Sequence, residues 1–340
     1  MAASAGLMIL RPGMLASVQD LGRYGHRQLG ICPGGALDTM ALTLANRLVG
    51  NADGAAGLEL TLGGCEIRFE QDTRIALAGE AFGAVLDGAP VAPCWSLPVR
   101  AGQSLRLGGA ATGLRRGLRS WLAVAGGIDV PVVLGSRSTD LKAGFGGLEG
   151  RALRKGDRLP IGASVLGASQ LTRRPFGVQP PAWGDAPGEP ITLRVLPGPE
   201  SEQFLQAAHK LLHGETWRIT PQSNRMGSRL AGPELKRRRG ATDMLSAGVV
   251  PGTVQVPPSG QPIILMGDAQ TTGGYPRIAV VIRADLWKLA QAPLGALLRL
   301  VAVDEQSALD AWNARQRYLA QVAQGLGFLG WPAGERHDGN

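Results

Sequence analysis

The stretch from Gly57 to Leu107 places short apolar runs one after another with only turns between them, which restricts the possible folds more than any other segment. Residues Leu58 to Leu62 alternate with a period of two, and further runs occupy Glu66 to Phe69, Arg74 to Leu77 and Ser104 to Leu107. Strands this close together leave no helices between them. The pattern therefore favours a closed antiparallel sheet or barrel over parallel βαβ units.

Glycine and proline are frequent along the whole chain. Fifty glycines and 23 prolines are spread over 340 residues without a repeat period, which favours short strands and tight turns over long helices. The helices that we expect are few: one starting at the N-cap Asp38, one from Glu200 to His213, a short one capped by Asp285, and one from Asp304 to Leu326. The predicted fold class is mainly β with a few helices (α+β).

Amphipathic spacing predicts which side chains of the two longer helices are buried. These are Phe204, Leu205, Ala208, Leu211 and Leu212 in the first, and Leu309, Trp312, Leu319 and Val322 in the second.

The length of the chain is sufficient for two domains with their own cores. Residues 168–190 are rich in Pro, Gly, Ser and Ala and are predicted to be a linker. The linker separates an N-terminal β-barrel module, residues 1–167, from a C-terminal β-barrel module, residues 191–303, and residues 304–340 form a last helix and tail.

The composition is that of an ordinary globular protein, with 44% hydrophobic and 18% charged residues and a net charge of +8. Only five of the 35 basic residues are lysines, and arginine is the better residue for recognising carboxylates. The one dense basic run, Lys236 to Arg239, has no aromatic residues among it and is expected to be a solvated loop, so no nucleic-acid partner is predicted. No signal peptide or membrane-length apolar span is evident, and we expect a cytoplasmic protein.

A polar cluster follows the apolar run from Pro262 to Met266, which reads as a short buried strand. So many hydrogen-bonding side chains at the end of such a strand are unusual in a core and common at a site. The alternative is that they only close an Asx- or ST-turn. The side chains in question are Asp268, Gln270, Thr271, Thr272 and Tyr275, with Gln255 on the preceding run.

Three further polar, glycine-bearing loops carry the other candidate binding residues. The loop from Gly135 to Leu159 places a guanidinium among hydroxyls and backbone amides, as an anion cradle does, although an ordinary surface loop has the same composition. The candidates are Gln19, Asp20 and Arg23 in the first loop, Ser136, Arg137 and Ser138 in the second, and Asn224 and Arg225 in the third.

Common catalytic motifs are missing from the sequence. There is no Walker A motif, no G-x-S-x-G and no H-E-x-x-H, and the three cysteines form no CxxC pair, so no metal site is predicted. A G-x-G-x-x-G match at Gly325, Gly327 and Gly330 follows a helix instead of opening one, which is the wrong context for a dinucleotide. Catalysis would have to rest on arginine, carboxylate, amide and hydroxyl groups.

Several ordered motifs together resemble a known family. They are PGMLASVQDLGRYGHRQLG with GGALD, LANRLVGN, LGSRSTD with GRALRKGD, RVLPGP, QSNRMGSRL and QVPPSGQPIILMGDAQTTGGYPRIAVV. The set resembles the family of bacterial 5-oxoprolinase C subunits, also described as allophanate hydrolase subunit 2 or a biotin-dependent carboxyltransferase family (KipA-like). It is similar as well to the second half of the carboxyltransferase domain of urea carboxylase.

The resemblance implies tandem cyclophilin-like β-barrel modules and a heteromeric complex. The partners that it implies are a KipI-like B subunit and a LamB/YcsF-like A subunit. Together these cleave 5-oxo-L-proline to L-glutamate with ATP, which this chain or another part of the complex binds. The chain has no biotin-bearing Met-Lys-Met segment, so a carboxyltransferase role would need biotin on another chain.

The chemistry of the side chains suggests roles toward a small anionic amide. Arg137 or Arg225 would hold the carboxylate, and Asp268 would accept the ring N–H, with Gln270 and Tyr275 orienting it. The hydroxyls of Thr271 and Thr272, or amides near Gly273 and Gly274, would stabilise an oxyanion. Gln19, Asp20 and Arg23 would complete the pocket.

Two rival interpretations remain open. One is a carboxyltransferase that acts with carboxybiotin on urea or another amide. The other is a non-catalytic KipA-like regulator that binds a KipI-like partner.

Overall fold

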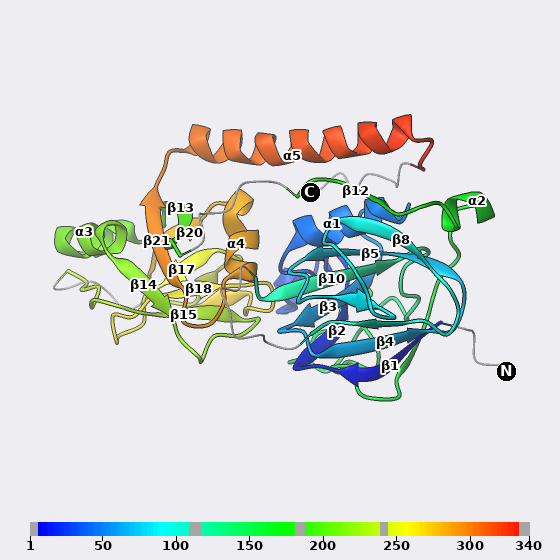
Figure 1. The fold of residues 1–340 in the computed structure, drawn as a ribbon. Coiled ribbons are helices and arrows are strands. Elements are labelled where there is room, and N and C mark those ends of the chain that lie inside the picture. The colour runs from blue at the N-terminus through cyan, green and yellow to red at the C-terminus, as the bar shows by residue number, and fades with distance from the viewer. Residues whose placement is uncertain (1–5, 109–116, 181–187, 239–243, 333–340) are drawn as a thin grey trace. The chain divides into compact units, whose positions relative to one another are not determined.

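The computed structural model describes residues 6–108, 117–180, 188–238 and 244–332 (Figure 1). The chain divides into two compact units. Unit 1 comprises Met1–Arg23, Gly34–Pro181 and Tyr318–Asn340, and unit 2 comprises Tyr24–Pro33 and Ala182–Arg317. Parts of the predicted linker and of the predicted tail, residues 181–187 and 333–340, lie outside the described residues.

Unit 1 is built on two six-stranded antiparallel sheets. The first runs in the order β11 (Arg158–Pro160), β1 (Gly6–Pro12), β4 (Cys65–Phe69), β9 (Ser104–Arg106), β6 (Val85–Leu86) and β7 (Ala89–Pro90). The second runs in the order β12 (Phe176–Gly177), β8 (Trp95–Val99), β5 (Thr73–Gly79), β10 (Arg119–Val124), β3 (Gly57–Thr61) and β2 (Leu15–Gln19). The closely spaced runs predicted from the sequence are all strands here, so the mainly β assignment is confirmed.

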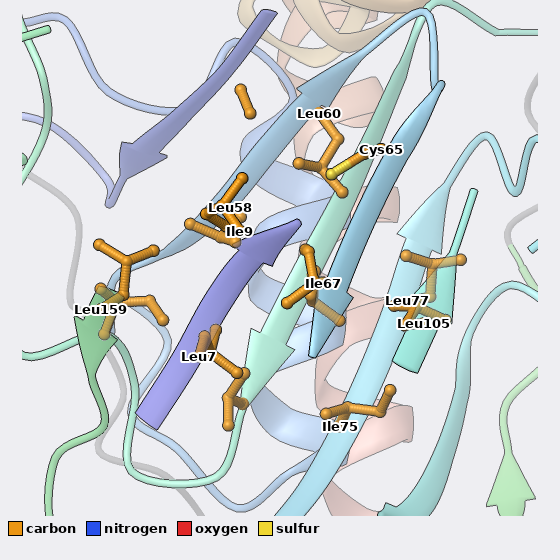
Figure 2. Close-up of a cluster of buried hydrophobic side chains, with 14 of the residues drawn as sticks. Leu7, Ile9, Leu58, Leu60, Cys65, Ile67, Ile75, Leu77, Leu105 and Leu159 are labelled. Atoms are coloured by element: carbon orange, nitrogen blue, oxygen red, sulfur yellow. The ribbon is translucent and has the colours of Figure 1, made fainter. Parts of the chain in front are cut away.

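The core of unit 1 lies between the two sheets. Figure 2 shows side chains of both sheets meeting there, including Leu7 and Ile67 from the first and Leu58 and Ile75 from the second, all fully buried. In β4 the buried and less buried residues alternate, as expected for a sheet with one face on a core. In β10 every residue is buried, because helix α1 (Thr39–Leu48) packs on the other face of that sheet.

Helix α1 begins where the sequence predicts it. The side chain of Asp38 accepts a hydrogen bond of 3.0 Å from the backbone N–H of Ala41, which satisfies one of the donors that a helix leaves open at its start. At the other end, Asn51 donates to Asn46 and to the carbonyl oxygen of Val124 in β10. The helix is therefore fastened to the sheet at the point where it ends.

Unit 2 contains a closed seven-stranded barrel. Its strands follow the order β13 (Ile191–Pro197), β20 (Arg277–Val281), β17 (Thr253–Gln255), β18 (Ile263–Leu265), β15 (Gly227–Ala231), β14 (Thr216–Ile219) and β21 (Leu297–Ala302). The barrel closes through a parallel pairing of β13 with β21, whereas its other pairs are antiparallel. A separate two-stranded sheet joins β16 (Ala247–Gly248) to β19 (Thr272–Gly273).

Helices and 3-10 turns complete the described elements. They are the 3-10 turns η1 (Arg27–Leu29), η2 (Ser201–Gln203) and η3 (Arg283–Asp285), and the helices α2 (Ala168–Leu171), α3 (Gln206–Gly214), α4 (Leu286–Gln291) and α5 (Glu305–Phe328). The residues of α5 are divided between the units, since Tyr318 and those after it belong to unit 1.

The prediction that Asp285 caps a helix with its side chain is wrong. Asp285 stands at the N-cap position of α4 but makes no side-chain cap. Its carboxylate instead accepts three hydrogen bonds of 2.6–2.9 Å from Arg194 on β13, two from the guanidinium and one from the backbone N–H. A bidentate charge-assisted pair is stronger than a neutral capping bond, so the distant arginine takes the carboxylate.

Two residues that the sequence predicts to be buried in helices are exposed in the structure. Leu205 has extended backbone angles just before α3 begins, so it is not on the helix face and is 40% exposed. Leu309 is 51% exposed because it lies one position off the buried stripe of α5, which includes Arg315, Leu319 and Val322.

The start of the predicted linker is ordered around Arg74. This arginine is fully buried, and it donates to the carbonyl oxygens of residues 170, 171, 173 and 174 and to Ser96. Its guanidinium lies 4.9 Å from the ring of Phe176 and 5.1 Å from that of Trp331. Burial lowers the pKa of Arg74 to about 10, so it remains charged at neutral pH. Because Phe176 continues into β12, this segment packs as part of unit 1.

We expect Arg74→Met to lower the free energy of unfolding by about 3 kcal/mol, because several buried carbonyl oxygens would lose their donor together. Urea denaturation measures the loss, and limited proteolysis should show new cleavage within residues 168–177. Arg158→Met is the matched control, because Arg158 makes only an exposed pair with Glu70. Equal stability of the two variants would contradict the role of Arg74.

Candidate functional site

The candidate site in unit 2 centres on a buried ion pair at the end of β18. Arg225 Nε lies 2.8 Å from Asp268 Oδ2, and Arg225 Nη2 lies 3.0 Å from Asp268 Oδ1. The two side chains are only 5% and 6% exposed. Such a two-point contact fixes the plane of the carboxylate as well as its position.

The backbone around this pair explains how the two side chains meet. The backbone N–H of Asp268 donates to the carbonyl oxygen of Arg225, and that of Met266 donates to Met226. Asn224 holds the turn before them, since its side-chain oxygen accepts from the backbone N–H of Met226 at 2.8 Å. The predicted third polar loop is therefore paired with the end of the predicted strand.

The remaining predicted residues of unit 2 lie on the segment that follows Asp268. Gln270, Thr272 and Tyr275 are exposed, whereas Thr271 is buried and its carbonyl oxygen accepts from Val249. Gln255 is 2% exposed and donates to the carbonyl oxygen of Tyr275 at 3.3 Å. This arrangement presents two side chains with hydroxyl groups and one amide side chain to solvent beside a rigid carboxylate.

The segment after Asp268 passes close to Gln255 at Gly273. A Cβ built at Gly273 would lie 2.5 Å from Gln255 Nε2, closer than real contacts allow. A side chain at residue 273 would therefore displace the buried amide of Gln255 from its place beside β19.

Two arginines for which the sequence predicts no role hold this segment in place. Arg277 pairs with Glu200 at 2.5 Å and 2.7 Å and also donates to the carbonyl oxygen of Gly248. Arg27 donates to the carbonyl oxygen of the next residue, Val249. Both anchor the strand that pairs with β19. No local sequence pattern could reveal these contacts, because the partners are up to 222 residues apart.

A second polar cluster, in unit 1, is organised by Asp20. Its Oδ1 accepts from the hydroxyls of Ser136 (2.7 Å) and Ser138 (2.5 Å) and from the N–H of Gly22 (2.7 Å). Its Oδ2 accepts from the backbone N–H of Arg137 at 2.6 Å. The carboxylate therefore joins the first polar loop to the second, which is a structural use of a residue predicted to bind substrate.

Gln19 and Arg23 of the same cluster are buried and bind consecutive carbonyl oxygens. Gln19 Nε2 donates to Thr139 at 3.1 Å, and Arg23 Nη2 donates to Ser138. The guanidinium of Arg23 also lies over the ring of Phe145, with 4.7 Å between Cζ and the ring centroid.

Arg137 has a different environment from the rest of this cluster. Its side chain is 35% exposed and pairs with Asp129 at 2.6 Å. Arg137 thus lies in unit 1 beside Asp20, whereas Arg225 and Asp268 are in contact with each other in unit 2. That all the polar loops share one pocket stays a prediction.

The described side chains do not favour a cysteine nucleophile or a metal site. Burial raises the pKa of Cys65 and of Cys94 to about 12, so these thiols are protonated at neutral pH and are not nucleophiles. In the four described ranges, no group of three or more His, Cys, Asp or Glu residues could hold a metal ion. No helix in these ranges is both long enough and apolar enough to cross a membrane.

Comparisons with known proteins agree with this architecture. Residues 29–302 match the family described as carboxyltransferase domain, subdomain A and B. The C subunit of the 5-oxoprolinase of Escherichia coli (strain K12) is 50% identical over 317 residues, which cover 93% of this chain and 97% of that protein. The C subunit of the Haemophilus influenzae 5-oxoprolinase is 40% identical and covers 90% of this chain and 94% of that protein. The crystal structure of the K. lactis urea amidolyase matches 94% of this chain and 20% of its own chain, at 29% identity and a TM-score of 0.83.

We expect Asp268→Asn to destabilise the fold by about 3 kcal/mol, because the buried guanidinium of Arg225 would lose its carboxylate. The double variant Arg225→Met/Asp268→Leu removes both charges and should recover part of the loss. Urea denaturation of the two proteins distinguishes these outcomes. A double variant less stable than Asp268→Asn would contradict the assignment.

Glu200 should make the free energy of unfolding decrease as the pH is lowered into the acid range. Hydrogen bonds from Arg277 hold the pKa of Glu200 below its usual value of 4.5 in the folded protein. Its contribution is therefore complete above the unfolded pKa and is lost as the pH falls through the lower folded value. Urea denaturation at about pH 7 and about pH 3 should show a smaller difference for Glu200→Gln than for the wild type. Glu202→Gln, which changes an exposed neighbour, should keep the wild-type difference.

Proposed function

The chain belongs to the family of carboxyltransferase domains, subdomains A and B, and we propose that it is the C subunit of a 5-oxoprolinase complex. Such a complex would hydrolyse the lactam of 5-oxo-L-proline to L-glutamate. The observation that carries the proposal is the near full-length likeness to two proteins named as C subunits of 5-oxoprolinase. The contacts at the end of β18 are compatible with it, because they expose amide and hydroxyl groups beside a fixed carboxylate.

In this proposal the Arg225–Asp268 pair acts as one unit. The guanidinium is engaged by the carboxylate, so Arg225 serves to orient Asp268 and does not hold the substrate carboxylate itself. The carboxylate of Asp268 accepts the ring N–H of the lactam. A carboxylate held in one plane loses little entropy when it binds, which favours a rigid substrate such as a five-membered lactam.

The residues after Asp268 would act on the carbonyl group of the lactam. Attack by water places negative charge on that oxygen, and donors directed at it lower the barrier. We assign this role to the hydroxyl of Thr272, which is exposed, and to backbone N–H groups near Gly273 and Gly274. Gln270 and Tyr275, which are also exposed, would orient the ring. Arg277 and Arg27 keep the facing strand in position.

ATP would bind elsewhere in the complex. Two glycines of the only nucleotide-like motif, Gly325 and Gly327, lie inside helix α5, where the backbone N–H groups are used within the helix. This glycine motif therefore does not form a phosphate-binding loop. We propose that a LamB/YcsF-like A subunit and a KipI-like B subunit complete the complex in the cytoplasm.

A biotin-dependent carboxyltransferase is the second candidate, favoured by the match to the urea amidolyase structure. The same donors that recognise a lactam would recognise urea and the ureido group of carboxybiotin. Addition of a biotinylated carrier protein and labelled bicarbonate distinguishes the two functions. Carboxyl transfer to urea without cleavage of 5-oxoproline would replace the first proposal by the second.

The proposal predicts that the purified chain, combined with the A and B subunits, cleaves 5-oxoproline in the presence of ATP. Asp268→Asn should lower kcat by at least about 100-fold, and Thr272→Ala by about 10-fold, since each removes an interaction made with the reacting group. Release of glutamate is the measurement.

Asp310→Asn, on the exposed part of α5, is the control and should turn over normally. Because Asp268→Asn also affects the fold, the Arg225→Met/Asp268→Leu variant provides a second test. It should be folded and inactive. A folded double variant with wild-type kcat would overturn the role of Asp268.

A further inference from the structure

Three arginines lie on the outer face of the barrel in unit 2. Arg229 is on β15, Arg218 on β14 and Arg299 on β21, and these strands are neighbours in the barrel (Figure 1). All three residues are exposed, whereas the residues on either side of each, such as Trp217 and Leu298, are buried. Because side chains alternate along a strand, all three guanidinium groups are directed away from the barrel interior.

The register of the strands places the three arginines on one diagonal. Arg218 is directly opposite Ala231 of β15 and Leu297 of β21. Arg229 comes two residues before Ala231, and Arg299 comes two residues after Leu297, so each is a diagonal neighbour of Arg218. Diagonal neighbours on one face of a sheet lie about 7–8 Å apart, within reach of long side chains. Together the three residues form an arginine line across the barrel.

No acidic side chain of the described chain neutralises the arginine line. Among the ion pairs that the described residues form, none includes Arg218, Arg229 or Arg299. The exposed Glu215, just before β14, is absent from those ion pairs as well. Arg218 donates to the carbonyl oxygen of Gly295 at 3.2 Å, which positions the guanidinium but leaves its charge in place. Like charges side by side destabilise a sheet, so the line gains from an anionic partner.

Two exposed arginines on the strands of unit 1 have a different environment. Arg106 on β9 pairs with Glu66, which is directly opposite on β4. Arg158 on β11 pairs with Glu70, just after β4. The chain thus supplies a glutamate to each of these arginines and none to the arginine line. This contrast indicates that the counter-charge of the line comes from another molecule.

The spacing of the arginine line fits an extended acidic segment. Alternate residues of an extended chain are about 6.6 Å apart and point to the same side. That repeat is close to the separation of about 7–8 Å between diagonal neighbours on a sheet. Aspartate or glutamate at alternate positions of such a segment would therefore present one carboxylate to each guanidinium, and such charge-assisted hydrogen bonds are the strong ones.

The other side chains of this face favour a polypeptide over a nucleic acid. Leu297, directly opposite Arg218, is 37% exposed, and Leu294 in the preceding turn is 47% exposed. Apolar groups next to arginine are characteristic of protein interfaces. Single-stranded nucleic acid also needs aromatic side chains for base stacking. The one aromatic residue of these three strands, Trp217, is buried inside the barrel.

We propose that the arginine line is a docking surface for an extended acidic segment of a partner protein. The surface lies wholly in unit 2 and includes none of the residues assigned to the lactam. That the segment belongs to another subunit of a 5-oxoprolinase complex rests on the proposed function. The preference for alternating carboxylates rests on the arginine line itself.

The test measures binding of a fluorescent peptide of alternating glutamate and threonine to the full chain by anisotropy. A peptide of the same composition with its glutamates in one block, and single-stranded oligothymidylate, are the competing probes. The wild type should bind the alternating peptide most tightly, and binding should weaken between about 50 mM and about 500 mM salt. The variant Arg218→Gln/Arg229→Gln/Arg299→Gln should bind it at least about 10-fold more weakly.

The matched control is Arg68→Gln/Arg106→Gln/Arg158→Gln, which removes three exposed arginines from the strands of unit 1 and changes the net charge equally. It should keep the wild-type affinity. Thermal unfolding establishes that both variants are folded. Equal binding of the block peptide, tighter binding of oligothymidylate, or unchanged affinity in the barrel variant would overturn the proposal.

The assignment to a subunit is tested in the reconstituted complex. The barrel variant should lose a subunit in size-exclusion chromatography, and the control variant should retain both. If the barrel variant assembles normally and the complex still releases glutamate from 5-oxoproline, the docking assignment fails and the proposed function stands. If 5-oxoproline is not cleaved but the alternating peptide binds in an arginine-dependent way, the reverse holds.

Discussion

Bidentate contacts between arginine and carboxylate groups are the constraint on which the ordered loops of this protein depend. A chain with 50 glycines has many segments without side chains to pack, and its turns must be held by polar contacts. In unit 2, Arg225 with Asp268 joins two turns, Arg277 with Glu200 joins a strand to a turn, and Arg194 with Asp285 joins a strand to a 3-10 helix. The planar fork of arginine suits this use, because two parallel hydrogen bonds set orientation as well as distance.

The same constraint affects how the candidate site is interpreted. A charged residue in a polar loop invites a catalytic role, yet Asp20 uses its oxygens to join two loops of unit 1, and Arg225 is engaged by Asp268. The exposed hydroxyl and amide groups after Asp268, in contrast, are open to solvent in unit 2.

The residues that form the core and the candidate site residues occupy different parts of the sheets and the barrel. The core of unit 1 is aliphatic and lies between its sheets, and the barrel strands of unit 2 carry few of the candidate residues. Those residues lie at strand ends and in the loops between strands, where substitutions change contacts without opening the core. A carboxyltransferase domain can in this way serve proteins named for different reactions, as the oxoprolinase subunits and the urea amidolyase are.

The sequence by itself determined the features that depend on near neighbours. Strands β3, β4, β5 and β9 follow from short apolar runs between turn residues, and the start of α1 follows from Asp38, because a cap acts within four residues. The motif at the end of β18 marked a polar cluster, and the ordered motifs indicated the family. Only the tertiary structure decided which partner each charged side chain takes. Asp285 stands at the N-cap position of a helix but binds Arg194, 91 residues away. Leu205 and Leu309 are exposed because of where one helix begins and which face of the other is buried. Charge pairs and packing faces are set by distance in space, which local spacing along the chain does not encode.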